Sequence, residues 1–245
     1  MGVTQHGRTD RLDLADPTLR EWQCTVLASD AETGIVLDRS AFYPGGGGQP
    51  PDHGVLLWDG VQTRIVGTRK GDDPYLIPAD GDPLPPVGAE VTGAIEDERR
   101  SILMRTHSGL HVLCGVVFRD FGALVTGNNM EVGEARMDFN LPEVPVDFKT
   151  RLEELVNAEV IADRRIAARV LSRADALALP DIIRTQSNLI PAGEVEIRIV
   201  DIAGLDVQAD GGTHVASTAQ IGKVAVVKVE SKGKANRRVR VRILD

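Results

Sequence analysis

The hydrophobic pattern of this 245-residue chain changes its period near Glu96, and that change divides the chain into two regions. Before Glu96, short apolar stretches alternate with clusters of Asp, Gly and Pro, which is typical of a small β-barrel or β-sandwich. The expected strands are Cys24–Leu27, Gly34–Leu37, Val55–Trp58, Thr63–Val66 and Glu90–Ile95, and a long surface loop is expected over Pro78–Pro86. We therefore predict a β-barrel domain over residues 1–95.

After Glu96 the apolar residues follow a helical period that is interrupted by strand-like runs. Helices are predicted over Glu96–Arg119 and Phe148–Arg165. The strand-like runs are Ala135–Phe139, Ile166–Leu171, Val195–Ala203, Val224–Val229 and Val239–Leu244, and the polar loop Ser231–Asn236 joins the last two as a hairpin. Helices packed on an antiparallel sheet predict an α+β domain over residues 96–245.

Composition narrows the class of protein. Hydrophobic residues make up 42% of the chain and charged residues 26%, which is the mix of a folded globular protein. No apolar run approaches the roughly 18 residues of a membrane span, and the first ten residues, MGVTQHGRTD, lack the apolar region of a secretory signal. The chain has two cysteines, too few for a disulfide framework, so we expect a location in the reducing cytoplasm and no contact with a membrane.

The formal net charge of −8 hides a basic C-terminal segment. Residues 222–245 carry eight basic and two acidic side chains, which gives this segment a charge of +6. A basic end on an acidic chain predicts contact with a polyanion. The candidate residues for phosphate contacts are Lys232, Lys234, Arg237 and Arg238. On charge alone, an edge hairpin that Lys and Arg protect against aggregation explains the segment equally well.

Two histidines, His107 and His111, stand four residues apart in the first predicted helix. That spacing places both imidazoles on one helix face, where they can bind one metal ion, although surface histidines show the same spacing. A third histidine, His214, follows Asp210 in the segment VQADGGTH, whose two glycines allow a tight turn. These four residues predict a zinc site, because nitrogen and oxygen donors both suit zinc. The alternative is an ordinary turn with a capping aspartate.

Four consecutive glycines, Gly45, Gly46, Gly47 and Gly48, lie in the segment FYPGGGGQP. Such a run costs conformational entropy, and it is expected where the backbone must approach a ligand closely or adopt a positive φ. The aromatic and proline residues on either side stiffen its ends, which argues against the alternative of a flexible linker. The run is not a P-loop, because it lacks the GK[ST] that would cradle phosphates.

Together these motifs resemble a known family. FYPGGGGQP, ERRSILMRTHSGLH, DVQADGGTHV, IGKV and SKGKANRR look like the free-standing alanyl-tRNA editing proteins of the AlaX type, which are similar to the editing domain of alanyl-tRNA synthetase. The resemblance covers roughly Leu12 to Leu244. It implies a barrel like those of translation factors, followed by an α+β editing domain of the type shared with threonyl-tRNA synthetase.

The resemblance also implies an activity and a site. The family hydrolyses the ester that joins a wrong amino acid to alanine tRNA, chiefly serine, with glycine as a second substrate. Its metal is zinc, and its ligands are the two histidines of HxxxH and the Cys and His of CxxxH. Carried over, these ligands become His107, His111, position 210 and His214, with tRNA as the partner.

This chain departs from the family pattern at one ligand, because position 210 is Asp rather than Cys. A carboxylate keeps the negative charge but is a harder donor than a thiolate, so zinc is expected to bind less tightly and to stay a stronger Lewis acid. Three interpretations stay open: Asp210 binds the zinc, Asp210 does not bind it but positions water, or the site has lost its metal. We expect Cys114 to be a buried small hydrophobe rather than a substitute ligand.

The remaining site assignments concern positioning. Gln49 is expected to orient water or substrate, with backbone N–H groups of the glycine run near the oxyanion. Thr213, with Gly211 and Gly212, is a candidate for the amino-acid pocket, where a polar group that bonds the serine hydroxyl would be left unpaired by alanine. Zinc either polarises the carbonyl or lowers the pKa of water, or it only holds the substrate, and the residues fit each of these roles.

Two other classes of function remain open on sequence. One is a metal-dependent hydrolase of a small ester or amide that does not use RNA, and the other is a non-catalytic RNA-binding module. The chain has nine aromatic residues, so base stacking is not the main source of RNA affinity and phosphate contacts are expected instead. Salt-dependent tRNA binding distinguishes the first class from editing, and metal content distinguishes the second.

Overall fold

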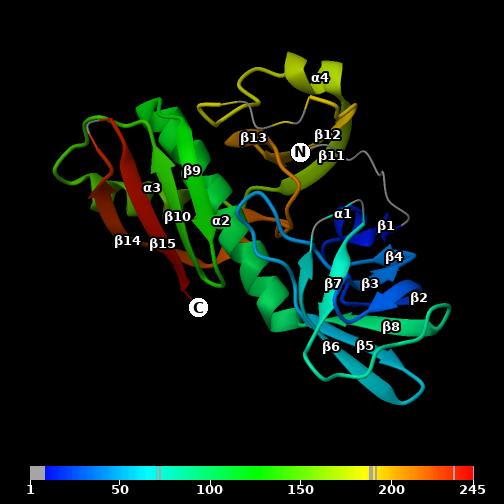
Figure 1. Cartoon of the computed structure of the whole chain (residues 1–245). Coiled ribbons are helices and arrows are strands. Elements are labelled where there is room, and N and C mark those ends of the chain that lie inside the picture. The colour runs from blue at the N-terminus through cyan, green and yellow to red at the C-terminus, as the bar shows by residue number, and fades with distance from the viewer. Residues whose placement is uncertain are drawn as a thin grey trace. The chain divides into compact units, whose positions relative to one another are not determined.

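The computed structural model describes residues 9–69, 71, 73–187, 190, 192–233 and 235–244 (Figure 1). The chain forms two compact units, a barrel unit that ends at Ser101 and a second unit that begins at Ile102. This division lies inside helix α2 (Asp97–Phe121), whereas the sequence pattern predicts it between residues 95 and 96. The predicted boundary is the position at which the apolar residues begin to follow a helical period. The first turn of α2 nevertheless belongs to the barrel unit, because Arg100 bonds there to Asp52 and to the carbonyl of Ala41.

Six antiparallel strands close the barrel in the order β2-β3-β7-β6-β5-β8. They are β2 (Glu21–Asp30), β3 (Gly34–Leu37), β5 (Gly54–Trp58), β6 (Val61–Arg69), β7 (Tyr75–Pro78) and β8 (Glu90–Ile95). The remaining elements of this unit are the parallel pair β1 (Asp10–Arg11) and β4 (Arg39–Ser40), and helix α1 (Leu12–Ala15). The expected barrel is confirmed. The sequence pattern does not predict strand β7, because a four-residue run that ends in proline is more typical of a loop.

The barrel core is built from alternate strand residues, because successive side chains of a strand point to opposite faces. Trp22, Leu56 and Ile65 are buried there, and the Trp22 ring meets Phe42 edge-on with 5.1 Å between centroids. Gly93 in β8 has a specific role in this packing. A Cβ at that position would lie 2.4 Å from Cζ2 of Trp22, so the indole occupies space that only glycine leaves open.

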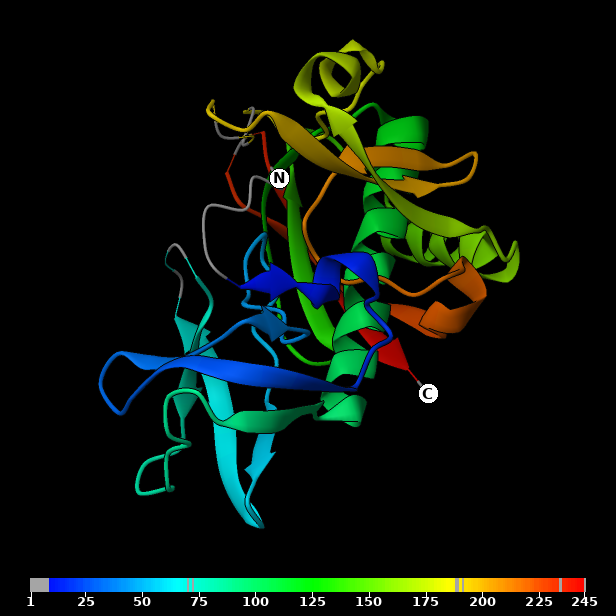
Figure 2. The ribbon, with the colours of Figure 1, turned by 90° about the vertical axis from the view of Figure 1, so that its right-hand side faces the viewer.

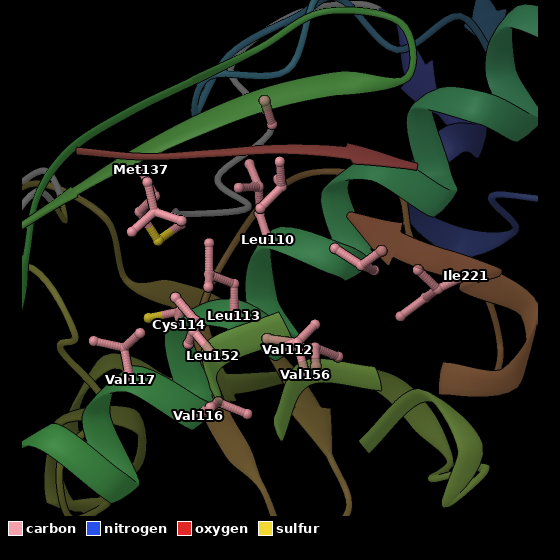
Figure 3. Close-up of a cluster of buried hydrophobic side chains, with 14 of the residues drawn as sticks. Leu110, Val112, Leu113, Cys114, Val116, Val117, Met137, Leu152, Val156 and Ile221 are labelled. Carbon is pink, nitrogen blue, oxygen red and sulfur yellow. The ribbon is translucent and has the colours of Figure 1, made fainter. Parts of the chain in front are cut away.

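The second unit contains a four-stranded antiparallel sheet in the order β14-β15-β10-β9. Its strands are β9 (Val125–Met130), β10 (Glu134–Phe139), β14 (Lys223–Ser231) and β15 (Arg237–Leu244). Helices α2 and α3 (Phe148–Ile161) pack their apolar faces against this sheet. Figure 3 shows Leu110 and Leu113 of α2, Met137 of β10 and Leu152 and Val156 of α3 in this shared core.

A three-stranded antiparallel sheet completes the second unit (Figure 2). It comprises β11 (Ile166–Ser172), β12 (Glu196–Ile202) and β13 (Asp206–Ala209), with helix α4 (Arg173–Ala178) after β11 and the short 3-10 helix η1 (Thr218–Ile221) after β13. Successive side chains of strand β12 point to opposite faces and so enter two different hydrophobic cores. Ile197 and Ile199 pack with Ala176 of α4, whereas Val200 and Ile202 join the main core.

Several elements of the second unit differ from the sequence prediction. Helix α3 ends at Ile161 rather than at Arg165, because Asp163 takes a left-handed φ of 48° that stops the helix. Strand β9, with the sequence VTGNNM, lacks the alternation that identifies a strand. Strand β13 lies within a predicted loop, because its four residues adjoin the glycines of that loop.

Helix α2 is long and apolar enough, by length and composition alone, to cross a membrane. The sequence pattern does not reveal this, because polar residues such as Thr106 and Ser108 interrupt its apolar runs. In the structure, 78% of its most apolar window is buried inside the protein. Thr106, Ser108 and the two histidines of HxxxH are buried with it, as expected of a core helix that carries polar side chains to an interior site.

Candidate metal centre

Three histidines and one aspartate meet inside the second unit. His107 and His111 project from one face of α2, as their four-residue spacing predicts, and they are only 4% and 6% exposed. Asp210 and His214 come from the loop that follows β13. One ligand atom from each residue can be chosen so that all four lie within 4.8 Å of one another. The structure thus brings together the four residues that the sequence predicts as metal ligands.

All three imidazoles turn Nε2 toward the carboxylate of Asp210. Oδ1 lies 3.1 Å from Nε2 of His214, and Oδ2 lies 3.5 Å from Nε2 of His107 and 3.8 Å from Nε2 of His111. A tetrahedral zinc ion with bonds of about 2.0–2.2 Å holds its donors about 3.3–3.6 Å apart. The three separations from the Asp210 carboxylate, 3.1–3.8 Å, bracket that range, so three imidazoles and one carboxylate form a donor set of the kind and size that can hold one metal ion.

The carboxylate of Asp210 also shapes the loop that carries it. Its Oδ1 accepts a hydrogen bond of 2.6 Å from the N–H of Gly212, which makes an Asx turn. Arg198, which is 3% exposed, donates from Nη1 to the carbonyls of Asp210 and Gly212 at 3.1 and 3.0 Å. A positive φ occurs at neither Gly211 nor Gly212. The tight turn therefore depends on Asp210 and Arg198 rather than on the left-handed backbone that glycines allow.

The charge states at this site follow from burial and from neighbouring groups. Burial raises the pKa of Asp210, but the nearby histidines, His107 first, outweigh it and hold that pKa well below its usual range. Burial and the charge of His107 lower the pKa of His214 well below its ordinary value. An ionised carboxylate and a neutral imidazole are the forms that bind a metal.

His111 has the opposite shift. Burial alone lowers its pKa, but the carboxylates of Asp206 and Asp210 outweigh burial and raise the pKa to about 9. The two carboxylates therefore favour the protonated form of His111 when no metal is bound. A metal bound at Nε2 would compete with a proton there.

Two residues beside the histidines are missed by the sequence analysis. Asp206 has an oxygen 3.8 Å from Nδ1 of His111. Ser108 has its hydroxyl 3.4 Å from Nδ1 of His214 and accepts a hydrogen bond from the N–H of Val215. Residues 206, 208 and 210 alternate onto one face of an extended chain, so recognising strand β13 would have placed Asp206 beside Asp210.

Comparison with known proteins identifies the family of this chain. Residues 197–240, which include Asp210 and His214, match the family model described as "Threonyl and Alanyl tRNA synthetase second additional domain". The chain is 35% identical over 237 residues to the alanyl-tRNA editing protein AlaX-M of Saccharolobus solfataricus, which covers 94% of this chain and 97% of the relative. The chain belongs to the alanyl-tRNA editing proteins of the AlaX type. The family predicted from the sequence motifs is confirmed.

Two further relatives describe the extent of this likeness. The AlaX-M protein of Methanosarcina mazei is 32% identical, with 97% of each chain covered. The alanine–tRNA ligase of Pyrobaculum neutrophilum is 36% identical over 91% of this chain but only 25% of the ligase. The AlaX-type chain thus corresponds in length to a whole AlaX-M protein and to one part of a ligase.

In this AlaX-type chain, the glycine run of the barrel unit forms an ordered turn. The φ angles of Gly45–Gly48 are all positive, at 81°, 135°, 58° and 97°. The N–H of Gln49 donates to the carbonyl of Gly46 at 2.8 Å, the N–H of Gly46 donates back to Gln49 at 2.9 Å, and the Tyr43 hydroxyl donates to Gly46 at 3.0 Å. The backbone therefore requires glycine here, and the run is not a flexible linker. The Gln49 side chain is buried, at 2% exposure.

A buried ion pair holds the two ends of this glycine turn. Asp52 and Arg100 are both fully buried. Arg100 Nε donates to Asp52 Oδ1 at 3.0 Å, and Asp52 Oδ2 accepts the N–H of Tyr43 at 2.7 Å. The carbonyl of Tyr43 in turn accepts the N–H of Asp52 at 3.1 Å. The Arg100–Asp52 pair thus joins the residues that enter and leave the turn.

The basic C-terminal hairpin, β14 with β15, pairs much of its charge within the protein. Arg238 donates to both oxygens of Asp138 at 2.7 Å, and Arg237 donates from Nη2 to the carbonyl of Pro142 at 2.5 Å. Lys232 is exposed, and Lys234 lies outside the described residues. Two further ion pairs are Arg240–Glu230 and Arg242–Glu134. Asp138 and Glu134 lie outside the segment and neutralise two of its arginines, so the charge of +6 counted along the sequence overstates by two the positive charge that this surface offers to RNA.

Proposed function

We propose that this aminoacyl-tRNA deacylase acts in trans on mischarged alanine tRNA and hydrolyses the ester of serine, with glycine as a second substrate, at a zinc ion. The observation that carries this proposal is the convergence of His107, His111, Asp210 and His214 within 4.8 Å in a chain of the AlaX type. Membership of the family supports alanine tRNA as the partner. The donor set supports the zinc.

Each group in the proposed site has a role that its chemistry allows. Bound zinc supplies Lewis acidity, which polarises a carbonyl or brings the pKa of water to about 7. Asp210 supplies the single negative charge of the ligand set, and the 3.1 Å contact with His214 holds its carboxylate in place. Thr213, buried beside His214, and the backbone of Gly211 and Gly212 are the proposed contacts to the amino acid.

We propose that a polar group at the amino-acid site selects serine over alanine. A group that bonds the serine hydroxyl is left unpaired when alanine enters, and an unpaired buried polar group is costly enough to reject the smaller amino acid. We propose that Thr213 supplies this group. As separate proposals, the turn at Gly45–Gly48 contacts the substrate and Gln49 orients the substrate or water.

Two further parts of the proposal concern the barrel and the location. We propose that the six-stranded barrel is related to the barrels of translation factors, in keeping with its closed topology. The cytoplasm, where tRNA is charged, is the proposed location, and both cysteines are free and buried as a reducing compartment allows.

The test is deacylation of seryl-, glycyl- and alanyl-tRNA(Ala) with and without a chelator, together with the zinc content of the purified protein. The proposal expects about one zinc per chain, hydrolysis of seryl-tRNA(Ala) that the chelator abolishes, and little hydrolysis of alanyl-tRNA(Ala). Hydrolysis of small esters with no effect of tRNA supports a small-molecule hydrolase instead. Salt-dependent tRNA binding with neither zinc nor turnover supports a binding module.

Gln49→Ala is expected to lower kcat for seryl-tRNA(Ala) more than it raises KM, because an orienting group acts mainly in the transition state. Single-turnover deacylation measures this effect. The matched control is Gln62→Ala, which removes an exposed glutamine from strand β6 of the same barrel. Equal rates for the parent and Gln49→Ala would remove Gln49 from the site.

Gly47→Ala is expected to reduce both stability and seryl-tRNA(Ala) hydrolysis. Its φ of 58° is left-handed, where a side chain costs about 1–2 kcal/mol. Gly60→Ala separates the two effects, because Gly60 has a φ of 75° and an added Cβ there meets nothing within 4 Å. Thermal melts should fall similarly for both variants, while deacylation falls only for Gly47→Ala. A parallel loss of rate in both variants would attribute the effect to stability alone.

Neutralising Lys232, Lys234, Arg237 and Arg238 is expected to raise KM for tRNA with little change in kcat, the signature of lost uniform binding. The slope of log affinity against log salt should flatten by roughly 0.7–0.9 for each phosphate group that the variant no longer binds. We expect Lys232→Gln with Lys234→Gln to account for most of the effect, because Arg237 and Arg238 are bonded to carbonyl and carboxylate groups of the protein.

The control for this charge change removes two exposed cations elsewhere, by Lys149→Gln in α3 with Arg169→Gln in β11. That variant should keep the KM and salt slope of the parent. If the hairpin charges only protect a sheet edge, the hairpin variants would aggregate more readily while their KM and salt slope stayed those of the parent.

A further inference from the structure

The imidazole of His111 lies between two carboxylates. Its Nε2 is 3.8 Å from Oδ2 of Asp210, on the side of the metal centre, and its Nδ1 is 3.8 Å from Oδ2 of Asp206, on the far side. The ring is only 6% exposed, and Nδ1 is a buried atom that makes no hydrogen bond to the described residues. A buried ring nitrogen without a partner is costly, and here it points at a fixed acceptor.

Asp206 is held firmly in that position. Arg184 Nε donates to its Oδ1 at 2.9 Å, and the side-chain amide of Gln208 donates to its Oδ2. Arg184 is fixed in turn, because it donates to the carbonyl of Asp181 at 2.5 Å and stacks 3.8 Å above the ring of Phe118. Asp206 is thus a buried carboxylate whose charge Arg184 neutralises and whose orientation two donors set.

We propose that Asp206 is a positioning residue that accepts a hydrogen bond from Nδ1–H of His111 and so directs Nε2 of that ring at the metal. The inference rests on the proposed metal centre. A movement of about 0.8 Å brings the 3.8 Å separation to hydrogen-bond length. A histidine that binds a metal through one nitrogen usually donates its other N–H to a carboxylate, a carbonyl or water, which fixes both tautomer and ring angle.

The same arrangement occurs at a second ligand. Nδ1 of His214 faces the hydroxyl of Ser108 at 3.4 Å, while its Nε2 faces Asp210 at 3.1 Å. Both rings therefore present Nε2 to the centre and Nδ1 to a polar group outside it. The partner of His111 is the charged one of the two, so its loss should have the larger effect.

The first experiment compares the zinc affinity of the parent with that of Asp206→Asn, by competition with a chromogenic chelator. The asparagine keeps the shape of Asp206 but offers one acceptor oxygen where three donors converge. We expect the dissociation constant for zinc to rise by about 10–100-fold. The matched control is Asp201→Asn on the adjacent strand β12, whose side chain points to the opposite face of the sheet, and it should stay within about twofold of the parent.

Thermal melts of the metal-free proteins distinguish positioning from a structural role. We expect the metal-free Asp206→Asn variant to fold, and the stabilisation that saturating zinc provides to be smaller than in the parent. Zinc affinity equal to that of the parent in a folded Asp206→Asn variant would overturn the assignment.

The second experiment needs no variant. In zinc-loaded parent protein labelled with ¹⁵N-histidine, the chain has five histidines to resolve, and the ring nitrogens of His111 report its tautomer directly. We expect zinc on Nε2 and a proton on Nδ1 that exchanges slowly with solvent. Coordination through Nδ1 would overturn the proposal. A parent protein that binds no zinc would instead overturn the metal centre itself, so failure of the inference and failure of the proposed function give different results.

Discussion

Asp210→Ala is expected to weaken zinc binding by more than about 100-fold, beyond the loss caused by removing a residue that only supports a ligand. The alanine removes the one anionic donor, and it also removes the acceptor for the N–H of Gly212 that holds the loop in its turn. At a fixed zinc concentration below saturation, hydrolysis of seryl-tRNA(Ala) should fall with the fraction of the variant that holds zinc. Metal competition and single-turnover deacylation, measured on the same preparation, check both effects.

Asp210→Cys provides the comparison, because it restores the donor that the family pattern has at this position. A thiolate keeps the negative charge and is softer, so zinc should bind more tightly than in the parent, and activity should stay within about tenfold. The pair of variants decides between the interpretations of Asp210. If Asp210→Ala binds zinc and deacylates as well as the parent, Asp210 neither binds the metal nor positions water.

The convergence of the four candidate ligands could be predicted because most of the information for it is local. His107 and His111 lie one helical turn apart, and the apolar residues around them identify the helix. Asp210 and His214 stand four residues apart in one loop, so two short segments define the centre. The groups that support the ligands could not be predicted in this way. Asp206 requires the assignment of β13, and its partner Arg184 lies 22 residues away in an irregular segment.

The ion pairs of the protein surface are even harder to predict from the sequence than the groups that support the ligands. Asp138 neutralises Arg238 from a position 100 residues earlier, and Glu134 neutralises Arg242 from 108 residues earlier. Only the pairing of β10 with β15 brings these charges together, and no local pattern predicts that register. A count of charges along a segment therefore describes the chain rather than the surface that a tRNA meets.

Asp52→Ala is expected to lower the free energy of unfolding of the barrel unit by about 3–5 kcal/mol, because it removes the carboxylate that is hydrogen-bonded to the buried guanidinium of Arg100. The carbonyls of Pro17 and Ala41 still accept hydrogen bonds from Arg100, but they do not neutralise it. Urea unfolding followed by tryptophan fluorescence measures this change. Both tryptophans of the chain, Trp22 and Trp58, lie in barrel strands and therefore report on this unit.

Asp52→Ala with Arg100→Met should recover part of the stability, because removing the second charge also removes the cost of burying it alone. Asp82→Ala is the control for the removal of an aspartate from an exposed pair, since Arg64 is 60% exposed and stays solvated when its partner is removed. Losses that add in the double variant would show that the two charges do not interact. If the single variant unfolds more readily while the double variant regains stability, the pair is coupled. Any loss of deacylation that remains in the double variant then measures what the pair contributes by holding Tyr43 at the entrance to the glycine turn.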